Sequence, residues 1–406
     1  MPKAKTQKPR KPRPDFPLTP HPRGKWCKKI AGRIYYFGTW DDPEGALREY
    51  LEIRDELQAG SDPRQHVGKL TLSELCNRYL YNLEARMDAG EVGRWTFRDR
   101  KIVAAQLVGV LGRGVPVESL KPADFARLRN ELAKTLGPTV LKITISRIKS
   151  IFKWGWESEL LDKPIRFGPD FKPPSAKAIR QAKQAVGKKL FEADEVRTIL
   201  DGKDIASEDG TTQHISGANA QLRAMVLLGL NCGFGNTDVS DLPLSAVDLE
   251  TGWINFPRPK TAVERRCPLW PETRDALREA IRTRTEPKHA DDAGLLFVTM
   301  FGERWVRMRL KQDGSETPID NVGRQFGKLL NTLGIKRRGV NFYALRHTFR
   351  TVADETQDQP AVDFLMGHAP QSDDMAAVYR ESISDGRLKA VTEHVRKWLF
   401  SGKSKQ

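Results

Sequence analysis

The stretch that decides the fold lies toward the C-terminal end, where residues 341–357 read NFYALRHTFRTVADETQ. Its apolar residues recur at i, i+3 and i+7, the spacing of one face of a helix: Phe342, Leu345 and Phe349. The same helix would carry three basic side chains, Arg346, His347 and Arg350. Taken alone, these cations are equally consistent with a solvated helix face.

A second segment, residues 361–382, reads AVDFLMGHAPQSDDMAAVYRES. An apolar helix is predicted to run into Gly367, since glycine commonly ends helices in the left-handed conformation. His368 follows directly, and Tyr379 lies 11 residues further on. Singly, such a histidine is usually a cap or a surface group, and such a tyrosine usually packs, so only their order is informative.

Two segments further upstream complete the pattern. Residues 223–249, RAMVLLGLNCGFGNTDVSDLPLSAVDL, predict a helix, a glycine turn and a second helix. Residues 252–273, GWINFPRPKTAVERRCPLWPET, predict a β-hairpin that carries Lys260.

In this order, ALRHTF, LMGH and a following tyrosine resemble the C-terminal signature of the tyrosine recombinase (phage integrase) family, over residues 190–400. The resemblance implies a site-specific recombinase or integrase of a mobile genetic element. It implies that Tyr379 attacks DNA to form a 3′-phosphotyrosine, that Arg346 grips the scissile phosphate, that His368 donates a hydrogen bond to it, and that Lys260 protonates the leaving 5′-hydroxyl.

The chemistry explains these residue types. Attack on a phosphodiester puts extra negative charge on the non-bridging oxygens, which fixed cationic donors can stabilise. A tyrosine hydroxyl with a pKa of about 10 is a fair nucleophile beside such cations. Because the phosphotyrosine keeps the bond energy, we expect neither ATP nor any other cofactor. The scattered seven His and four Cys predict no metal site.

The sequence departs from the family pattern at two positions. Tyr343 stands where the family usually has a histidine, and its phenol can also donate a hydrogen bond. Gly235 stands where the family has its first arginine, three residues before the supporting acid, Asp238. Losing one such charge donor typically costs 10²–10³ in rate, about 3–4 kcal/mol. The nearest replacement cations in sequence are Arg265 and Arg266.

We predict a multidomain protein, mainly α with small β elements. The C-terminal domain would be the mixed α/β catalytic domain of the family. The chain is expected to begin with a basic disordered tail (residues 1–15) and an arm-type DNA-binding module of one small sheet and one helix (16–60). A helical core-binding domain (69–168), a basic linker (169–189) and the catalytic domain (190–400) are expected to follow.

Within the N-terminal module, Ala31-Gly32 separates two aromatic and β-branched runs, which predicts a hairpin. Asp42 is predicted to cap a helix that starts at Pro43. Its expected apolar face is Leu47, Tyr50, Leu51 and Ile53. The cations expected to contact DNA in this module and in the linker are Lys25, Lys28, Lys29, Arg33, Lys172, Lys177, Arg180 and Lys183. The module is also consistent with a small basic domain that has no DNA role.

Two helix signals deserve note. Thr71 ahead of Glu74 has capping-box spacing and predicts where the helical domain begins. In the closing segment, residues 385–400, an apolar stripe recurs at helical spacing: Leu388, Val391, Val395, Trp398 and Leu399. The stripe is expected either to pack on its own domain or, as the resemblance implies, to dock on a neighbouring protomer in a tetramer.

Charge points to the partner. The chain has 68 Lys and Arg against 52 Asp and Glu, a net charge of +16 and a pI near 9.7. Such a surplus of positive charge indicates that the binding partner is a polyanion. Its longest apolar run, 224–230, is too short to span a membrane. We expect a cytoplasmic, nucleoid-associated protein that binds double-stranded DNA as a homotetramer, with accessory DNA-bending or directionality factors. The alternative is a weakened or inactive DNA-binding regulator on the same fold, which Gly235 and Tyr343 favour.

Overall fold

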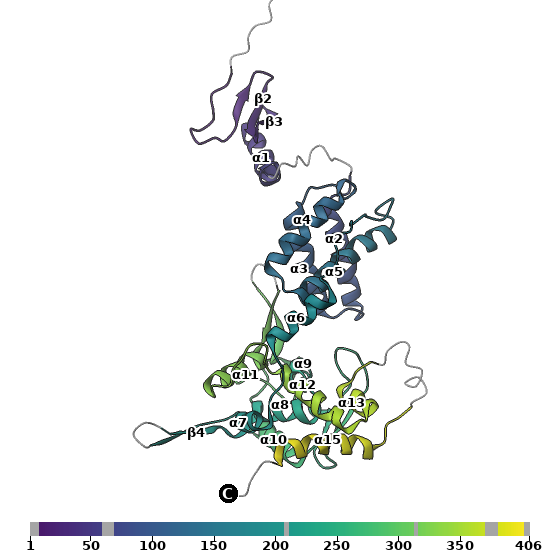
Figure 1. Cartoon of the computed structure of the whole chain (residues 1–406). Helices are drawn as coiled ribbons and strands as arrows, with labels where there is room; N and C mark the ends of the chain where they lie inside the picture. The colour runs from purple at the N-terminus through teal and green to yellow at the C-terminus, as the bar shows by residue number, and fades with distance from the viewer. Residues whose placement is uncertain (1–7, 59–68, 207–210, 312–315, 370–380, 402–406) are drawn as a thin grey trace, which may run out of the picture. The chain divides into compact units, whose positions relative to one another are not determined.

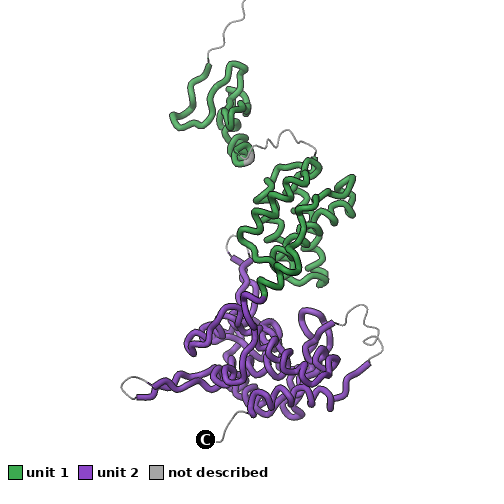
Figure 2. Tube along the Cα trace, in the orientation of Figure 1, with its two compact units in different colours: residues 1–183 green, residues 184–406 purple. Residues whose placement is uncertain are grey.

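The computed structural model describes residues 8–58, 69–206, 211–311, 316–369 and 381–401. The chain forms two compact units, residues 1–183 and residues 184–406 (Figure 2). The boundary lies inside the predicted linker. Among the described residues, no helix is both long and apolar enough to cross a membrane. The architecture is mainly helical with small sheets, as the sequence predicts (Figure 1).

The N-terminal module is a three-stranded antiparallel sheet in the order β1-β2-β3, followed by helix α1. The elements span Thr19–His21 (β1), Lys25–Ile30 (β2), Arg33–Thr39 (β3) and Pro43–Gln58 (α1). The predicted hairpin is confirmed, since Ala31 and Gly32 have φ of 46° and 83° as a tight turn of this kind requires. Asp42 Oδ1 accepts a hydrogen bond from Gly45 N at 2.8 Å, which confirms the predicted cap.

One predicted core residue of the module is wrong. Leu51 is 49% exposed, whereas Leu47 and Tyr50 are buried. Helix α1 is rotated so that Ala46 and Leu57 complete its buried face against the sheet. The apolar pattern is compatible with either rotation, and the packing against β3 selects one.

Four long helices form the helical region, and an aromatic cluster fills much of its core. They are α2, α3, α4 and α5, spanning Leu72–Asp88, Arg94–Leu111, Pro122–Thr135 and Pro138–Glu157. Thr71 caps α2 by accepting from Glu74 N at 3.2 Å, as its spacing predicts. The cluster consists of Phe125, Phe152, Phe167 and Phe171. Within the predicted linker, residues Ala176–Val186 form a further helix, α6, which the sequence analysis did not predict.

The C-terminal unit surrounds a buried helix, α8, with further helices and three small antiparallel sheets. Its helices are α7 (Ala193–Asp201), α8 (Ala220–Asn231), α9 (Asn236–Ser240), α10 (Pro271–Arg282), α11 (Asn321–Thr332), α12 (Tyr343–Ala353), α13 (Gln359–Met366) and α15 (Asp385–Phe400). Its strands are β4 (Lys203–Ala206), β5 (Thr212–Ile215), β6 (Val247–Asp248), β7 (Trp253–Asn255), β8 (Arg266–Pro268), β9 (Val306–Leu310) and β10 (Glu316–Asp320). Short 3-10 helices within the described residues cover Val117–Ser119, Leu244–Ala246, Ala290–Asp292 and Asp354–Thr356.

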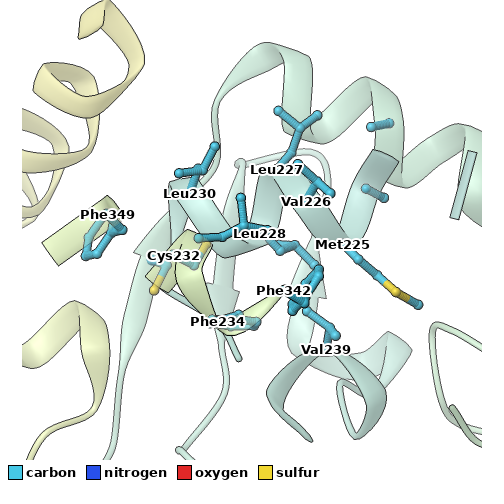
Figure 3. Packing of buried hydrophobic residues seen from close by; sticks show 14 of the residues in the cluster. Met225, Val226, Leu227, Leu228, Leu230, Cys232, Phe234, Val239, Phe342 and Phe349 are labelled. Carbon is cyan, nitrogen blue, oxygen red and sulfur yellow. The ribbon is translucent and has the colours of Figure 1, made fainter. Parts of the chain in front are cut away.

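Helix α8 is buried on all sides from Ala224 to Leu230 because it is apolar on all sides over these residues. Its side chains interdigitate with those of the glycine turn and of α12 (Figure 3). At Gly229 a Cβ atom would come within 3.0 Å of Leu345 Cβ, so α8 and α12 approach closely at this position. This contact fixes α12, the helix that carries Arg346.

The closing helix α15 packs on its own domain. Four residues of its apolar stripe lie in the core of the C-terminal unit, with Trp398 packed against them: Leu388, Val391, Val395 and Leu399. Trp270 Nε1 also donates to Thr392 O at 3.0 Å. Intramolecular packing therefore accounts for the burial of the stripe, and docking of this helix on a neighbouring protomer stays a prediction.

Candidate active site

Arg346 is the centre of the site. It lies on α12, is only 2% exposed, and its guanidinium reaches three segments of the domain. Nη1 donates to Gly233 O in the turn after α8, and Nη2 donates to Met366 O at 2.7 Å at the end of α13. Nη2 also lies 3.0 Å from His368 Nε2. The arginine thus holds together the glycine turn, α12 and the end of α13.

His368 is positioned by the helix end before it. Gly367 adopts φ 60°, the predicted left-handed cap of α13. His368 Nδ1 then lies 2.9 Å from Asp363 Oδ1. Because a guanidinium can only donate, Nε2 accepts from Arg346, and the ring proton is therefore on Nδ1, facing Asp363. Burial lowers the pKa of His368, and the Asp363 carboxylate opposes this only in part, so the ring is neutral at pH 7.

Asp363 connects the histidine to a second arginine. Its carboxylate accepts hydrogen bonds from His368, from Arg350 and, at 2.9 Å, from Gln359 Nε2. Burial would raise the pKa of Asp363, but these donors outweigh it and the pKa is lowered. A charged Asp363 favours the proton on Nδ1 and leaves Nε2 directed at Arg346.

The predicted β-hairpin is formed by β7 and β8, and its loop is docked onto the same glycine cap. Thr261 Oγ1 donates to Gly367 O at 3.0 Å, and Arg258 Nη1 lies 3.5 Å from the same oxygen. Lys260, beside Thr261 in the chain, is exposed. The loop that carries the exposed Lys260 is therefore attached, through the neighbouring Thr261, to the cap that precedes His368.

Tyr343 is the first residue of α12 and is 42% exposed. Its ring lies over Gly235, where a Cβ atom would come within 3.2 Å of two ring carbons. On its other side the ring makes an edge contact with His347, at 5.4 Å between centroids. The two positions at which the sequence departs from the family pattern are therefore neighbours in space.

The two candidate replacement arginines have different environments. Arg265 is 3% exposed, and its Nη2 donates to Asp238 Oδ1 at 2.9 Å. Asp238 Oδ2 accepts from Gly235 N at 2.7 Å. Arg266 instead pairs with Asp385, its guanidinium carbon 3.9 Å from the Trp253 ring centroid. Of the two, only Arg265 contacts the glycine turn.

A third buried arginine was missed by the sequence analysis. Arg258 is 9% exposed and lies against Gly367, where a Cβ atom would come within 2.8 Å of Arg258 Cβ. The signal available was its position two residues before Lys260, but many such loop arginines face solvent. Burial, followed by repulsion from Arg258, lowers the pKa of Arg346 to about 10. The site therefore carries a concentrated positive charge.

Tyr379 falls outside the described residues. The cations predicted to contact DNA lie on β2, at the start of β3, and on or just before α6; all but the half-buried Lys28 are exposed: Lys25, Lys28, Lys29, Arg33, Lys172, Lys177, Arg180 and Lys183. In the described ranges we find no group of three or more His, Cys, Asp or Glu side chains that could hold a metal ion.

Comparisons with known proteins bear on the family and the fold of this chain. The model of the phage integrase family matches residues 189–385. A lambda integrase dimer bound to a COC′ core site is 19% identical over 92% of this chain and 96% of its own, with a TM-score of 0.52. A lambda integrase tetramer bound to a Holliday junction is 17% identical over 89% and 98%, with a TM-score of 0.53. The Tn1549 transposon integrase in complex with transposon right end DNA is 17% identical over 80% and 99%, with a TM-score of 0.51. At these identities the likeness concerns the fold, and no curated protein matches the chain.

Proposed function

This chain belongs to the phage integrase family, the tyrosine recombinases, through its residues 189–385, and we propose that it is a site-specific DNA recombinase of a mobile genetic element. It would cut and rejoin double-stranded DNA through a 3′-phosphotyrosine intermediate. Its substrate would be a phosphodiester within a specific duplex site, and the chemistry would need neither ATP nor a metal ion.

The observation that carries the proposal is the Arg346–His368–Asp363 chain of hydrogen bonds beside the docked Lys260 loop. A guanidinium held by two carbonyl groups has a fixed direction, so no reorganisation is needed when charge develops on a phosphate oxygen. The surplus of buried cations favours an anion in this place, because buried charges are costly unless they are paired.

Each residue has a role in the proposed reaction. The Tyr379 oxygen attacks phosphorus as its hydroxyl proton passes to water, and the bond from phosphorus to the 5′-oxygen breaks. Lys260, exposed beside Thr261, gives its proton to that leaving oxygen. Arg346 and His368 contact the non-bridging oxygens. With its proton on Nδ1, His368 donates from Nε2 only after it gains a second proton, which an adjacent phosphate anion favours and Asp363 stabilises. Tyr343 is a further hydrogen-bond donor at the edge of the site.

The proposed partners follow from relatives and from charge. Lambda integrase has been seen as a dimer on a core site and as a tetramer on a Holliday junction. We extend this to a homotetramer assembled on duplex DNA, aided by accessory DNA-bending or directionality factors. Contacts from the N-terminal module and from α6 would be largely to phosphates, since their cations are mostly exposed.

The alternative, a weakened or inactive DNA-binding protein that acts as a regulator or accessory factor, is favoured by Gly235 and Tyr343. One experiment separates the two functions. DNA fragments that flank the gene are first tested for binding to the protein. The fragments that bind are then made into nicked duplexes that trap a covalent intermediate. We expect a protein–DNA adduct that survives denaturing electrophoresis, is lost in Tyr379→Phe and persists in Tyr81→Phe, a control at a tyrosine that is 76% exposed. Retention of DNA without any adduct, at every nick position, would favour the regulator.

A further inference from the structure

We propose that Arg265 supplies, from the β-hairpin, the phosphate contact that the family's first arginine would supply from the position of Gly235. The inference rests on the proposed function, and it names a catalytic residue that has moved from one element of the fold to another. It also predicts that the site is complete in cations despite the glycine.

The hydrogen bonds of the Arg265 guanidinium leave one of its nitrogens without an acceptor among the described residues. Nε donates to Phe256 O at 2.8 Å and Nη2 donates to Asp238 Oδ1 at 2.9 Å, so two of its three nitrogens are fixed by the protein. Nη1 is buried and donates to no acceptor within the part of the chain that the structure describes. A buried guanidinium nitrogen without an acceptor is unfavourable, and an oxyanion would satisfy it.

The Arg265 side chain lies beside Gly235 and beside the cap that precedes His368. The Arg265 guanidinium carbon lies 4.0 Å from the centroid of Phe234, the residue before Gly235. A Cβ atom on Gly367, the residue before His368, would be 3.3 Å from Arg265 Cδ. The side chain therefore passes between the glycine turn and the cap that presents His368.

Gly235 and Arg265 share the same carboxylate, that of Asp238. Asp238, the acid that would support an arginine at position 235, binds Arg265 with one oxygen and Gly235 N with the other. A side chain at position 235 would meet the Tyr343 ring at 3.2 Å and would compete for the same carboxylate. Glycine at this position leaves the carboxylate to the arginine that arrives from the hairpin.

The buried arginines of the site outnumber the carboxylates that pair with them in the described parts of the chain. Arg258, Arg265 and Arg346 are all buried, and of these three only Arg265 is paired with a carboxylate of the described residues. The site therefore has more buried cations than anions. A phosphate bound beside Arg265 Nη1 would restore the balance.

The test uses the full-length protein and two measurements. The first is the rate of adduct formation on the nicked duplex. The second is the apparent Kd for inorganic phosphate without DNA, from the rise in melting temperature at constant ionic strength. We expect Arg265→Ala to slow adduct formation by about 10²–10³ and to weaken phosphate binding by about tenfold or more, the effect of losing one charged contact. Arg266→Ala is the matched control, and both quantities should stay within about threefold of the wild type, as for a surface ion pair.

A double variant that moves the arginine from position 265 to position 235 strengthens the test. Gly235→Arg combined with Arg265→Ala returns the arginine to the family's position, where its backbone is free of strain at φ −99°. We expect it to recover at least about tenfold of the lost rate, part of the effect of one charge donor. If Arg265→Ala does not fold because Asp238 is left unpaired, Arg265→Met with Asp238→Asn removes both charges of the pair and replaces it in the same measurements.

The outcomes are distinct. Wild-type protein that forms no adduct defeats the proposed function, and phosphate binding then decides the inference by itself. A folded Arg265→Ala that keeps its adduct rate within threefold overturns the catalytic role. A folded Arg265→Ala that loses the rate but keeps the wild-type phosphate affinity overturns the phosphate contact and leaves Arg265 a structural partner of Asp238.

Discussion

Replacing Asp363 by asparagine tests whether the hydrogen-bond chain behind His368 contributes to the reaction. The substitution keeps the size of the side chain and removes the charge that faces Nδ1–H at 2.9 Å. Without that carboxylate, the protonated form of His368 that donates to phosphate is less stable. The expected result is slower adduct formation with little change in DNA affinity.

The magnitude follows from the contact. A hydrogen bond to a charged group contributes about 1.5–3 kcal/mol when it is well buried. The side chains of His368 and Asp363 are 37% and 38% exposed, so we reduce this to about 1–2 kcal/mol for solvent screening. If the bond strengthens fully in the transition state, adduct formation slows about 5- to 30-fold.

The assay compares Asp363→Asn with Asp354→Asn on the same nicked duplex. Asp354 also binds Arg350, at 2.8 Å, but has no hydrogen bond to His368 among the described residues. We expect Asp354→Asn to stay within about twofold of the wild-type rate, as for an exposed pair. NMR titration of His368 gives an independent check, because losing Asp363 should lower the histidine pKa further. Equal rates in the two variants, or a His368 pKa that rises in Asp363→Asn, would refute the reasoning.

Three further predictions concern stability and binding. Gly367→Ala should destabilise the fold by about 1–3 kcal/mol in urea unfolding, because φ is 60° and the new Cβ would lie 2.8 Å from Arg258 Cβ; a change below about 0.5 kcal/mol, the size of an ordinary surface substitution, contradicts this. Burial raises the pKa of Asp241 from 3.8 to about 6, so the folded state binds the proton more tightly and wild-type stability falls as the pH rises through this range; relative to Asp241→Asn, urea unfolding at pH 4 and pH 7 should show a loss of about 2 kcal/mol, and a pH-independent difference would refute it. DNA affinity should fall linearly with salt on logarithmic axes, and replacing three cations of α6 by alanine should make the slope about 3 less negative, while an unchanged slope would mean that they contact no phosphate: Lys177, Arg180 and Lys183.

Local signals allowed much of the fold to be predicted. The turn at Ala31-Gly32, the cap at Thr71 and the left-handed end at Gly367 each depend on a few neighbouring residues, and all three are present in the structure. Leu51 was wrong because the rotation of α1 depends on its packing against the sheet. The expected nucleophile, Tyr379, stays a prediction.

The site was predictable as a set of residues but not as a set of contacts. The order of motifs indicated Arg346 and His368, which the structure brings within 3.0 Å of each other. The position of Arg258 two residues before Lys260 did not indicate that it is buried, because the direction of a loop side chain depends on how the hairpin docks onto Gly367.

The choice between Arg265 and Arg266 shows where sequence reasoning ends. Neighbouring residues at a strand point to opposite faces, so two adjacent arginines cannot both face the glycine turn, and their order in the chain does not say which does. The structure decides it through Asp238, which is within reach of Arg265, and Asp385, which takes Arg266. The glycine at position 235 then follows, since Asp238 already has a guanidinium partner. The apparent loss of an arginine and the arginine pair in the hairpin are therefore two parts of one arrangement around the same carboxylate.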